Sequence, residues 1–151
     1  MNFKGQQQES SSTVSYEGIK EYMAKESDLI TFRPDQEIAE AIDIMLEKRI
    51  SGGPVLNERR ELVGMLSERD CLKILIQASY HNIPSGKGLV EAYMSGNPKT
   101  LDINTTVVEA ANEFLNTFFR RFPVTDNGIL KGQISRRDIM KAAQKIKATT
   151  W

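Results

Sequence analysis

The most constraining feature of this 151-residue sequence is a short motif that occurs twice. The first copy, GMLSERD, occupies residues 64–70, and the second copy, GQISRRD, occupies residues 132–138. In each copy an apolar run ends at a serine, and an aspartate follows three residues later, just before an apolar run with helical spacing. This order is typical of a β-strand that leads directly into the N-terminus of a helix.

Other landmarks repeat in the same order around the two motifs. They are a Tyr-Met pair (residues 22–23 and 93–94), a threonine (Thr31 and Thr100) and a Pro-Val pair (residues 54–55 and 123–124). The separation of matching landmarks changes only from 71 residues (94 − 23) to 68 residues (138 − 70). Such regular spacing indicates an internal duplication, and we expect two halves that pack about a pseudo-twofold axis.

The hydrophobic pattern predicts the same elements in each copy, a β-α-β-β-α unit of an α/β fold. In the first copy the expected elements are helical residues from Ser15, a strand at 29–32, an amphipathic helix from Asp35 to the glycines Gly52 and Gly53, and a hairpin of strands 54–56 and 62–66. In the second copy Asp126, Asn127 and Gly128 predict a tighter hairpin turn.

The chain is therefore expected to divide into four parts. These are a disordered N-terminal tail (1–14), a first repeat (15–76), a linker (77–88) and a second repeat (89–147). The tail is assigned on its polar composition. Neither repeat is large enough to be stable alone, so the two are expected to share one folded structure.

Composition excludes several functional classes. The 20 basic residues balance the 20 acidic ones, so no nucleic-acid partner is expected. Cys71 is the single cysteine and His81 the single histidine, which leaves no zinc site, and no nucleophile stands beside a general base. The N-terminal region has no apolar stretch long enough for a signal peptide or a membrane span. We therefore expect a soluble, cytoplasmic protein that is not an enzyme, uses no metal and has no membrane partner.

Each motif has two interpretations. In the simpler one, Ser67 with Asp70, and Ser135 with Asp138, form capping boxes that satisfy free backbone groups at a helix start. In the other, the free N–H groups and the positive dipole end of the helix form a site for an anion. The repetition of the motif favours the second interpretation.

Two tandem β-α-β-β-α units with these landmarks resemble a pair of CBS domains, the arrangement called a Bateman module. The resemblance covers residues 15–146. It implies a regulatory module that binds adenosine-containing molecules, such as AMP, ADP, ATP, S-adenosylmethionine or NAD, in two clefts between the repeats.

The resemblance also implies which residues bind. In the family the motif aspartate binds the ribose hydroxyls, the motif serine or threonine lies near the phosphates, and base contacts come largely from the opposite repeat. Carried over by position, one cleft joins Ser135 and Asp138 to Thr31, Ile50 and Ser51. The other cleft joins Ser67 and Asp70 to Thr100, Phe119, Arg120 and Arg121.

Arg120 and Arg121 match a position where some relatives place a His-Arg pair on nucleotide phosphates. The guanidinium group suits that role because it can engage two phosphate oxygens at once. The alternative is a solvated strand end. The first copy has Gly52 in place of Arg121, and from this asymmetry we expect the cleft with Asp70 to prefer ligands with more phosphates. Arg120 stands where the first copy has Ser51, and its bulk would crowd the base slot.

Together these features predict a stand-alone, non-enzymatic sensor of adenine nucleotides with no obligatory cofactor and with AMP, ADP or ATP as its regulatory ligand. A homodimer formed through the helices of each half is expected, and the effector protein is unknown. The alternative is a ligand-free dimerisation or interaction scaffold, in which the four motif residues only cap helices.

Overall fold

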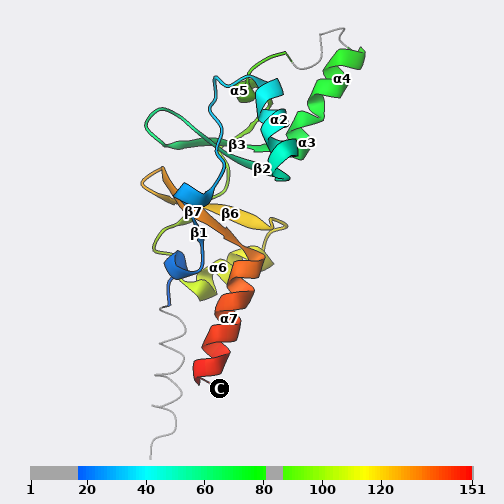
Figure 1. Cartoon of the computed structure of the whole chain (residues 1–151). Coiled ribbons are helices and arrows are strands. Elements are labelled where there is room, and N and C mark those ends of the chain that lie inside the picture. The colour runs from blue at the N-terminus through cyan, green and yellow to red at the C-terminus, as the bar shows by residue number, and fades with distance from the viewer. Residues whose placement is uncertain (1–16, 81–86, 151) are drawn as a thin grey trace, which may run out of the picture. The chain divides into compact units, whose positions relative to one another are not determined.

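The computed structural model describes residues 17–80 and 87–150 (Figure 1). The predicted tail (1–14), the expected cap at Ser15 and the linker residue His81 lie outside the described residues. No helix in the described part of the chain is both long enough and apolar enough to cross a membrane.

Contacts divide the chain into two compact units, which we name after their motif aspartates. The Asp70 unit contains residues 29–98 and 127–130. The Asp138 unit contains the residues before 29, residues 99–126 and the residues from 131 onward. Each unit thus combines most of one repeat with the segment that opens the other repeat in the sequence.

The Asp70 unit contains a three-stranded sheet in the order β2-β3-β4. Its elements are α2 (Ile38–Lys48), β2 (Gly52–Leu56), β3 (Leu62–Ser67), α3 (Glu68–Cys71), α4 (Lys73–Tyr80), α5 (Val90–Tyr93) and β4 (Ser95–Gly96). All pairings in this sheet are antiparallel. The core lies between the sheet and α2, with Phe32, Ile38, Val55, Leu66 and Val90 among its most buried side chains.

The Asp138 unit contains a four-stranded sheet in the order β1-β7-β6-β5. Its elements are η1 (Ile19–Glu21), β1 (Ala24–Lys25), η2 (Glu26–Asp28), β5 (Leu101–Asp102), α6 (Val107–Leu115), β6 (Arg121–Asp126), β7 (Ile129–Ser135) and α7 (Arg136–Thr150). The predicted hairpin turn is confirmed, because Asn127 and Gly128 both have positive φ angles, 49° and 84°, as a two-residue type I′ turn requires.

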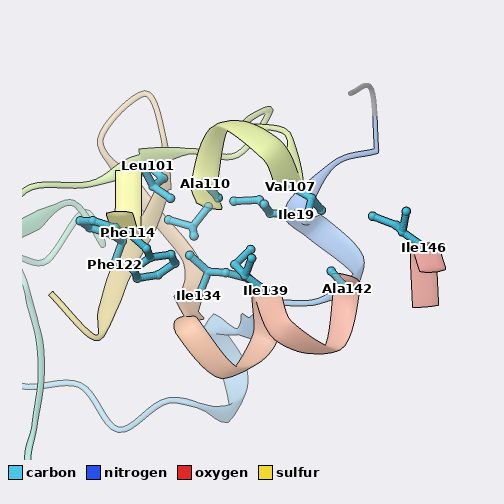
Figure 2. Close-up of a cluster of buried hydrophobic side chains, with 11 residues drawn as sticks. Ile19, Leu101, Val107, Ala110, Phe114, Phe122, Ile134, Ile139, Ala142 and Ile146 are labelled. Atoms are coloured by element: carbon cyan, nitrogen blue, oxygen red, sulfur yellow. The ribbon is translucent and has the colours of Figure 1, made fainter. Parts of the chain in front are cut away.

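The N-terminal segment is part of the core of the Asp138 unit. Figure 2 shows Ile19 beside Val107 of α6, and the Ile19 side chain is fully buried. The backbone N–H of Ile19 donates to the carbonyl of Thr105 (3.1 Å), and the N–H of Val107 donates to the carbonyl of Glu17 (2.8 Å). A segment that opens the first repeat in sequence therefore completes the unit formed by the second repeat.

Four expected features differ in the structure, and two of them are the ends of one helix. The helix expected from Asp35 begins at Ile38, because the preceding residues form a turn closed by Gln36, whose Oε1 accepts from the N–H of Arg33 (3.1 Å). The same helix ends at Lys48, where Arg49 adopts a left-handed conformation (φ 54°), so that Gly52 and Gly53 begin β2 instead of ending the helix.

The other two differences lie near the start of the first repeat. The helical pattern that begins before Ile19 yields only the three-residue 3-10 helix η1, because the chain next forms β1, in which Ala24 pairs with Gln133 of β7. The strand expected at 29–32 is reduced to one parallel bridge between Phe32 and Val55.

Candidate functional site

Both motifs cap the helix that they precede. In the first motif, the Asp70 N–H donates to Ser67 Oγ (3.1 Å) and the Ser67 N–H donates to Asp70 Oδ2 (3.0 Å). In the second motif, the Asp138 N–H donates to Ser135 Oγ (3.1 Å) and the Ser135 N–H donates to Asp138 Oδ2 (2.9 Å). The capping-box interpretation is therefore confirmed in both copies. In each carboxylate the cap uses Oδ2 and leaves Oδ1 for other partners.

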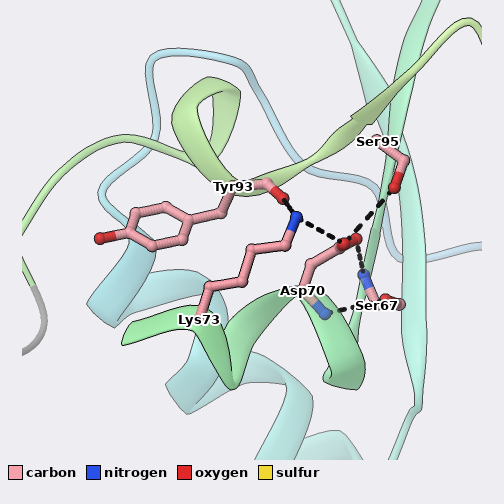
Figure 3. A network of polar contacts seen from close by, with 5 residues as sticks. All are labelled: Ser67, Asp70, Lys73, Tyr93 and Ser95. Carbon is pink, nitrogen blue, oxygen red and sulfur yellow. Dashed lines mark hydrogen bonds and ion pairs between the residues drawn. The ribbon is translucent and has the colours of Figure 1, made fainter. Parts of the chain in front are cut away.

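The Asp70 carboxylate has further partners within its unit (Figure 3). Lys73 Nζ donates to Asp70 Oδ1 (3.2 Å) and also to the backbone carbonyl of Tyr93 (3.2 Å). Ser95 Oγ on β4 lies 3.4 Å from the same Oδ1. With these groups around it, Asp70 is only 6% exposed.

The Asp138 carboxylate is partly exposed. Ala24 on β1 occupies the position that Ser95 has on β4, because Ala24 pairs with Gln133 of β7 and Ser95 pairs with Met65 of β3. An alanine side chain cannot donate a hydrogen bond. Lys141 stands three residues after Asp138, as Lys73 does after Asp70, yet its ammonium forms no ion pair with Asp138 in the described part of the chain.

In each unit, the residue that precedes the hairpin partner of the motif strand forms a backbone hydrogen bond with the motif. The N–H of Glu68 donates to the carbonyl of Ser51 (2.9 Å), and the N–H of Arg136 donates to the carbonyl of Arg120 (3.0 Å). These matching contacts confirm that Arg120 stands where the first copy has Ser51. Arg136 Nε also donates to the carbonyl of Phe119 (2.9 Å), whose ring meets Phe122 edge-on.

The predicted site residues divide between the two units. Those in the Asp70 unit are Thr31, Ile50, Ser51, Ser67 and Asp70. Those in the Asp138 unit are Thr100, Phe119, Arg120, Arg121, Ser135 and Asp138. Within the units, the structure brings Ser51 to the first motif and Arg120 to the second. The pairing of each motif with residues of the opposite repeat stays a prediction.

The two motifs differ in the charge around them. The second motif contains Arg136 and Arg137 and adjoins Arg120 and Arg121, and all four side chains are exposed. The equivalent positions in the Asp70 unit are Glu68, Arg69, Ser51 and Gly52. Four positive charges therefore surround the second motif, whereas the charges at the first motif cancel.

Two hollows lie in the Asp70 unit. One, of about 750 Å³, adjoins the motif and is lined by Ser67, Arg69, Asp70, Leu72, Lys73, Leu75, Ile76 and Ser95. The other, of about 690 Å³, is an apolar groove between α2 and the α3–α4 segment. Ile50 and Ser51 line this groove, together with Leu46, Leu72 and Leu75.

Cys71 is not suited to be a nucleophile. Burial raises the pKa of its thiol, and the negative charges of Asp70 and Glu68 raise it further. A thiol with a raised pKa stays protonated near neutral pH, and the thiolate is the reactive form. Cys71 instead packs against the core of the Asp70 unit as a small, partly buried side chain.

Sequence reasoning missed Lys73 and Ser95. Lys73 stands one helical turn after the motif aspartate, a spacing that brings side chains together, so it could have been found. Ser95 comes from β4, 25 residues further along the chain. Its contact depends on strand pairing that no local pattern predicts.

Comparison with known proteins identifies the same two repeats. The family model of the CBS domain matches residues 19–77 and 90–145. The chain belongs to the CBS domain family. The resemblance and the fold of two β-α-β-β-α repeats are thereby confirmed.

The related proteins include a CBS domain-containing protein and a dehydrogenase. CBS domain-containing protein CBSX1, chloroplastic, from Arabidopsis thaliana is 30% identical over 154 residues, which cover 85% of this chain and 65% of the relative. Inosine-5'-monophosphate dehydrogenase from Aquifex aeolicus is 34% identical over 113 residues, which cover 74% of this chain and 22% of the enzyme. The chain thus spans less than two thirds of the length of CBSX1 and a minor part of the dehydrogenase.

One solved structure matches this chain over almost the whole length of the solved protein. The crystal structure of CBSX2 in complex with AMP has 30% sequence identity and a TM-score of 0.75, and the match covers 87% of this chain and 98% of that one. CBSX2 is a CBS-pair protein from Arabidopsis thaliana. The CBS pair is therefore the part that this chain shares with a nucleotide-bound relative.

Proposed function

We propose that this CBS pair is a regulatory module that binds adenine nucleotides, acts in the cytoplasm and has no catalytic activity. The observation that carries this proposal is the state of the two motif aspartates. Each carboxylate is held in a fixed orientation by its cap through Oδ2. We assign Oδ1 to the ligand: at Asp138 no described side chain donates to it, whereas at Asp70 the ligand replaces Lys73 or Ser95. The likeness to CBSX2, which was crystallised with AMP, supports the choice of ligand.

The chemistry of a ribose suits such a carboxylate. Its cis-diol offers two O–H donors, and a hydrogen bond to a charged partner contributes about 1.5–3 kcal/mol. Two such bonds give millimolar affinity, for which about 4 kcal/mol is needed. Tighter binding requires burial of the base against an apolar side chain, and we assign this role to Ile50 and Phe119. Ser67, Ser135, Thr31, Thr100 and Ser51 complete the proposed polar contacts.

The phosphates are assigned to the arginines. Arg120 and Arg121 are exposed and carry no described ion pair with an acidic side chain, so their guanidinium groups are open to a phosphate. AMP, ADP and ATP differ only in phosphate number, and a paired guanidinium site discriminates among them through charge.

A thermal-shift screen with AMP, ADP, ATP, S-adenosylmethionine and NAD tests the proposal. A ligand that binds only the folded state at about 100 times its Kd stabilises it by about 2.7 kcal/mol. We expect at least one adenine nucleotide to raise Tm, and the double variant Asp70→Asn/Asp138→Asn to lose that rise. Asparagine keeps an oxygen that accepts the cap hydrogen bond but loses the charge that binds the diol.

Glu109→Gln is the matched control. Glu109 forms the same capping box with Thr106 at the start of α6, far from either motif in sequence. We expect its variant to lower Tm slightly and to leave the ligand-induced rise unchanged. If the double motif variant keeps the full ligand-induced rise, the aspartates only cap helices and the scaffold alternative holds.

We further propose that the protein forms a homodimer through the apolar groove of the Asp70 unit. Leu46, Leu72 and Leu75 line this groove together and are 73%, 60% and 60% exposed. Apolar side chains that are exposed in one patch mark an interaction site. Arg49 and Glu68 line the same groove with opposite charges. In a twofold dimer the same patch meets itself, so Arg49 of each copy can pair with Glu68 of the other.

Sedimentation velocity tests the dimer. We expect the parent chain to sediment as a dimer and Leu75→Asp to sediment as a monomer, because a carboxylate cannot be buried in the groove without a partner. Arg59→Asp in the exposed turn after β2 is the control and should stay dimeric. A monomeric parent chain, or a dimeric Leu75→Asp variant, contradicts this interface.

A further inference from the structure

The two motif carboxylates differ in how many acceptor positions they have left. A carboxylate has about four lone-pair positions, two on each oxygen. At Asp70 the cap takes one position on Oδ2, and Lys73 and Ser95 take both positions on Oδ1. At Asp138 the cap takes one position on Oδ2, and no described side chain donates to Oδ1.

A diol that binds through both carboxylate oxygens must therefore displace a protein donor at Asp70 but not at Asp138. Lys73 is the stronger of the two donors, since its ammonium is charged and lies closer to Oδ1 than the Ser95 hydroxyl does, 3.2 Å against 3.4 Å. The carbonyl of Tyr93 holds the same ammonium from the other side. The Lys73 side chain is 54% exposed, so it has room to move away when a ligand arrives.

We infer that Lys73 is an intramolecular competitor of the ribose at the Asp70 motif, and that adenosine consequently binds the Asp138 motif more tightly than the Asp70 motif. This inference rests on the proposed function, because it assumes that both aspartates bind a ribose. Lys73 lies beside the sugar position and acts by occupying the carboxylate. The order of filling of the two sites is then set by one lysine and by the exchange of Ser95 for Ala24.

The test isolates one motif at a time in the full chain. The Asp138→Asn variant retains only the Asp70 motif, and the Asp70→Asn variant retains only the Asp138 motif. Adenosine, which has no phosphate, is titrated into each variant by NMR, so that the arginines do not contribute. We expect Asp70→Asn to bind adenosine more tightly than Asp138→Asn.

The lysine is then removed in the Asp138→Asn background. Lys73→Met keeps the aliphatic chain and removes the charge, and we expect it to tighten adenosine binding about fivefold, the effect of one partly exposed ion pair. The affinity for 2′-deoxyadenosine, which has no cis-diol, should not change. Ser95→Ala in the same background should tighten adenosine binding by a smaller factor, about twofold. Ser95→Ala can therefore test the inference even if Lys73→Met fails to fold.

Lys141→Met in the Asp70→Asn background is the matched control, and we expect no change in adenosine affinity there. Unchanged or weaker adenosine binding by both Lys73→Met and Ser95→Ala overturns the inference. Weaker AMP binding by Lys73→Met with unchanged adenosine binding also overturns it, because Lys73 would then contact a phosphate. If the parent chain binds neither adenosine nor AMP, the proposed function itself fails.

Discussion

The Asp70 and Asp138 units follow one plan, and their differences separate what the motif determines from what its neighbours determine. Both motifs form the same capping box with the same atoms. The strand that pairs with the motif strand differs. It carries Ser95 in the Asp70 unit and Ala24 at the same position in the Asp138 unit. The motif therefore fixes the backbone and the orientation of the aspartate, whereas a residue from outside the motif decides whether the carboxylate is available.

The two units can also be compared at the segments that open the two repeats. In the Asp138 unit Ile19 N–H donates to the carbonyl of Thr105, and in the Asp70 unit Val90 N–H donates to the carbonyl of Gln36. Ile19 and Val90 are both fully buried. Each unit thus contains the segment that opens the other repeat, and the two segments make matching backbone contacts.

The largest expected effect comes from the core contact of this opening segment. Ile19→Ala should lower the free energy of unfolding by about 2–5 kcal/mol, because it leaves a cavity under α6. Denaturant unfolding measures the loss. Native-state hydrogen exchange should show reduced protection first in β7 and α7, although Ile19 belongs to the first repeat in sequence.

Val90→Ala is the matched change in the Asp70 unit. It removes two carbon atoms where Ile19→Ala removes three, so its cost should be smaller, at about 0.8 kcal/mol for each buried CH₂ together with a cavity contribution. Protection should fall first in β3 and α4. If Ile19→Ala reduces protection in β3 and α4 instead, the assignment of the N-terminal segment to the Asp138 unit is wrong.

An intermediate effect is expected at the motif glycines. A Cβ atom at Gly132 would overlap the backbone carbonyl oxygen of Ala24, whereas at Gly64 the nearest atom is the flexible Met94 Sδ, at 2.5 Å. Gly132→Ala should therefore cost about 1–3 kcal/mol of unfolding free energy, as overpacking does. Gly64→Ala should cost less, because Met94 can move. If the two variants unfold at equal denaturant midpoints, the prediction that Gly132 is the more tightly packed of the two glycines is wrong.

The smallest effect concerns pH. Burial raises the pKa of Tyr22 to about 12, with further contributions from its hydrogen bond to Glu17 and from the charges of Glu17 and Glu21. Between the ordinary value of 10.0 and about 12, the unfolded chain loses this proton before the folded chain does. The free energy of unfolding should therefore fall as pH rises through that window.

Tyr22→Phe should remove part of this fall. The measurement compares denaturant midpoints of the parent chain and the variant at about pH 9 and about pH 11. The parent should lose more stability than the variant between the two values. An identical loss in both would show that Tyr22 does not contribute to the pH dependence.

The sequence was sufficient to predict the duplication, the fold class, the hairpins and both capping boxes. These features depend on local patterns, such as the alternation that ends at Ser67 and Ser135 or the turn at Asn127 and Gly128. The CBS resemblance followed from the order of these landmarks, and the family match confirms it. The binding roles of the site residues stay predictions.

The features that could not be predicted depend on contacts between distant segments. A periodic pattern around Ile19 indicated a helix, but pairing of Ala24 with β7 limits it to three residues. The helix start at Ile38 is set by the Gln36 turn, a side-chain interaction that propensity does not include. The two hydrogen bonds on Asp70 Oδ1 similarly require knowledge of where Lys73 and β4 lie.

The opening segment at Ile19 has a consequence for synthesis on the ribosome. The Asp70 unit is built almost entirely from one continuous stretch, residues 29–98, whereas the Asp138 unit combines residues before 29 with residues after 98. As the nascent chain emerges, residues 29–98 are made close together in time, but Ile19 contacts α6 and α7, which are translated after that stretch. The residues of the Asp138 unit thus begin to be made first, but we expect the Asp70 unit to complete its fold first.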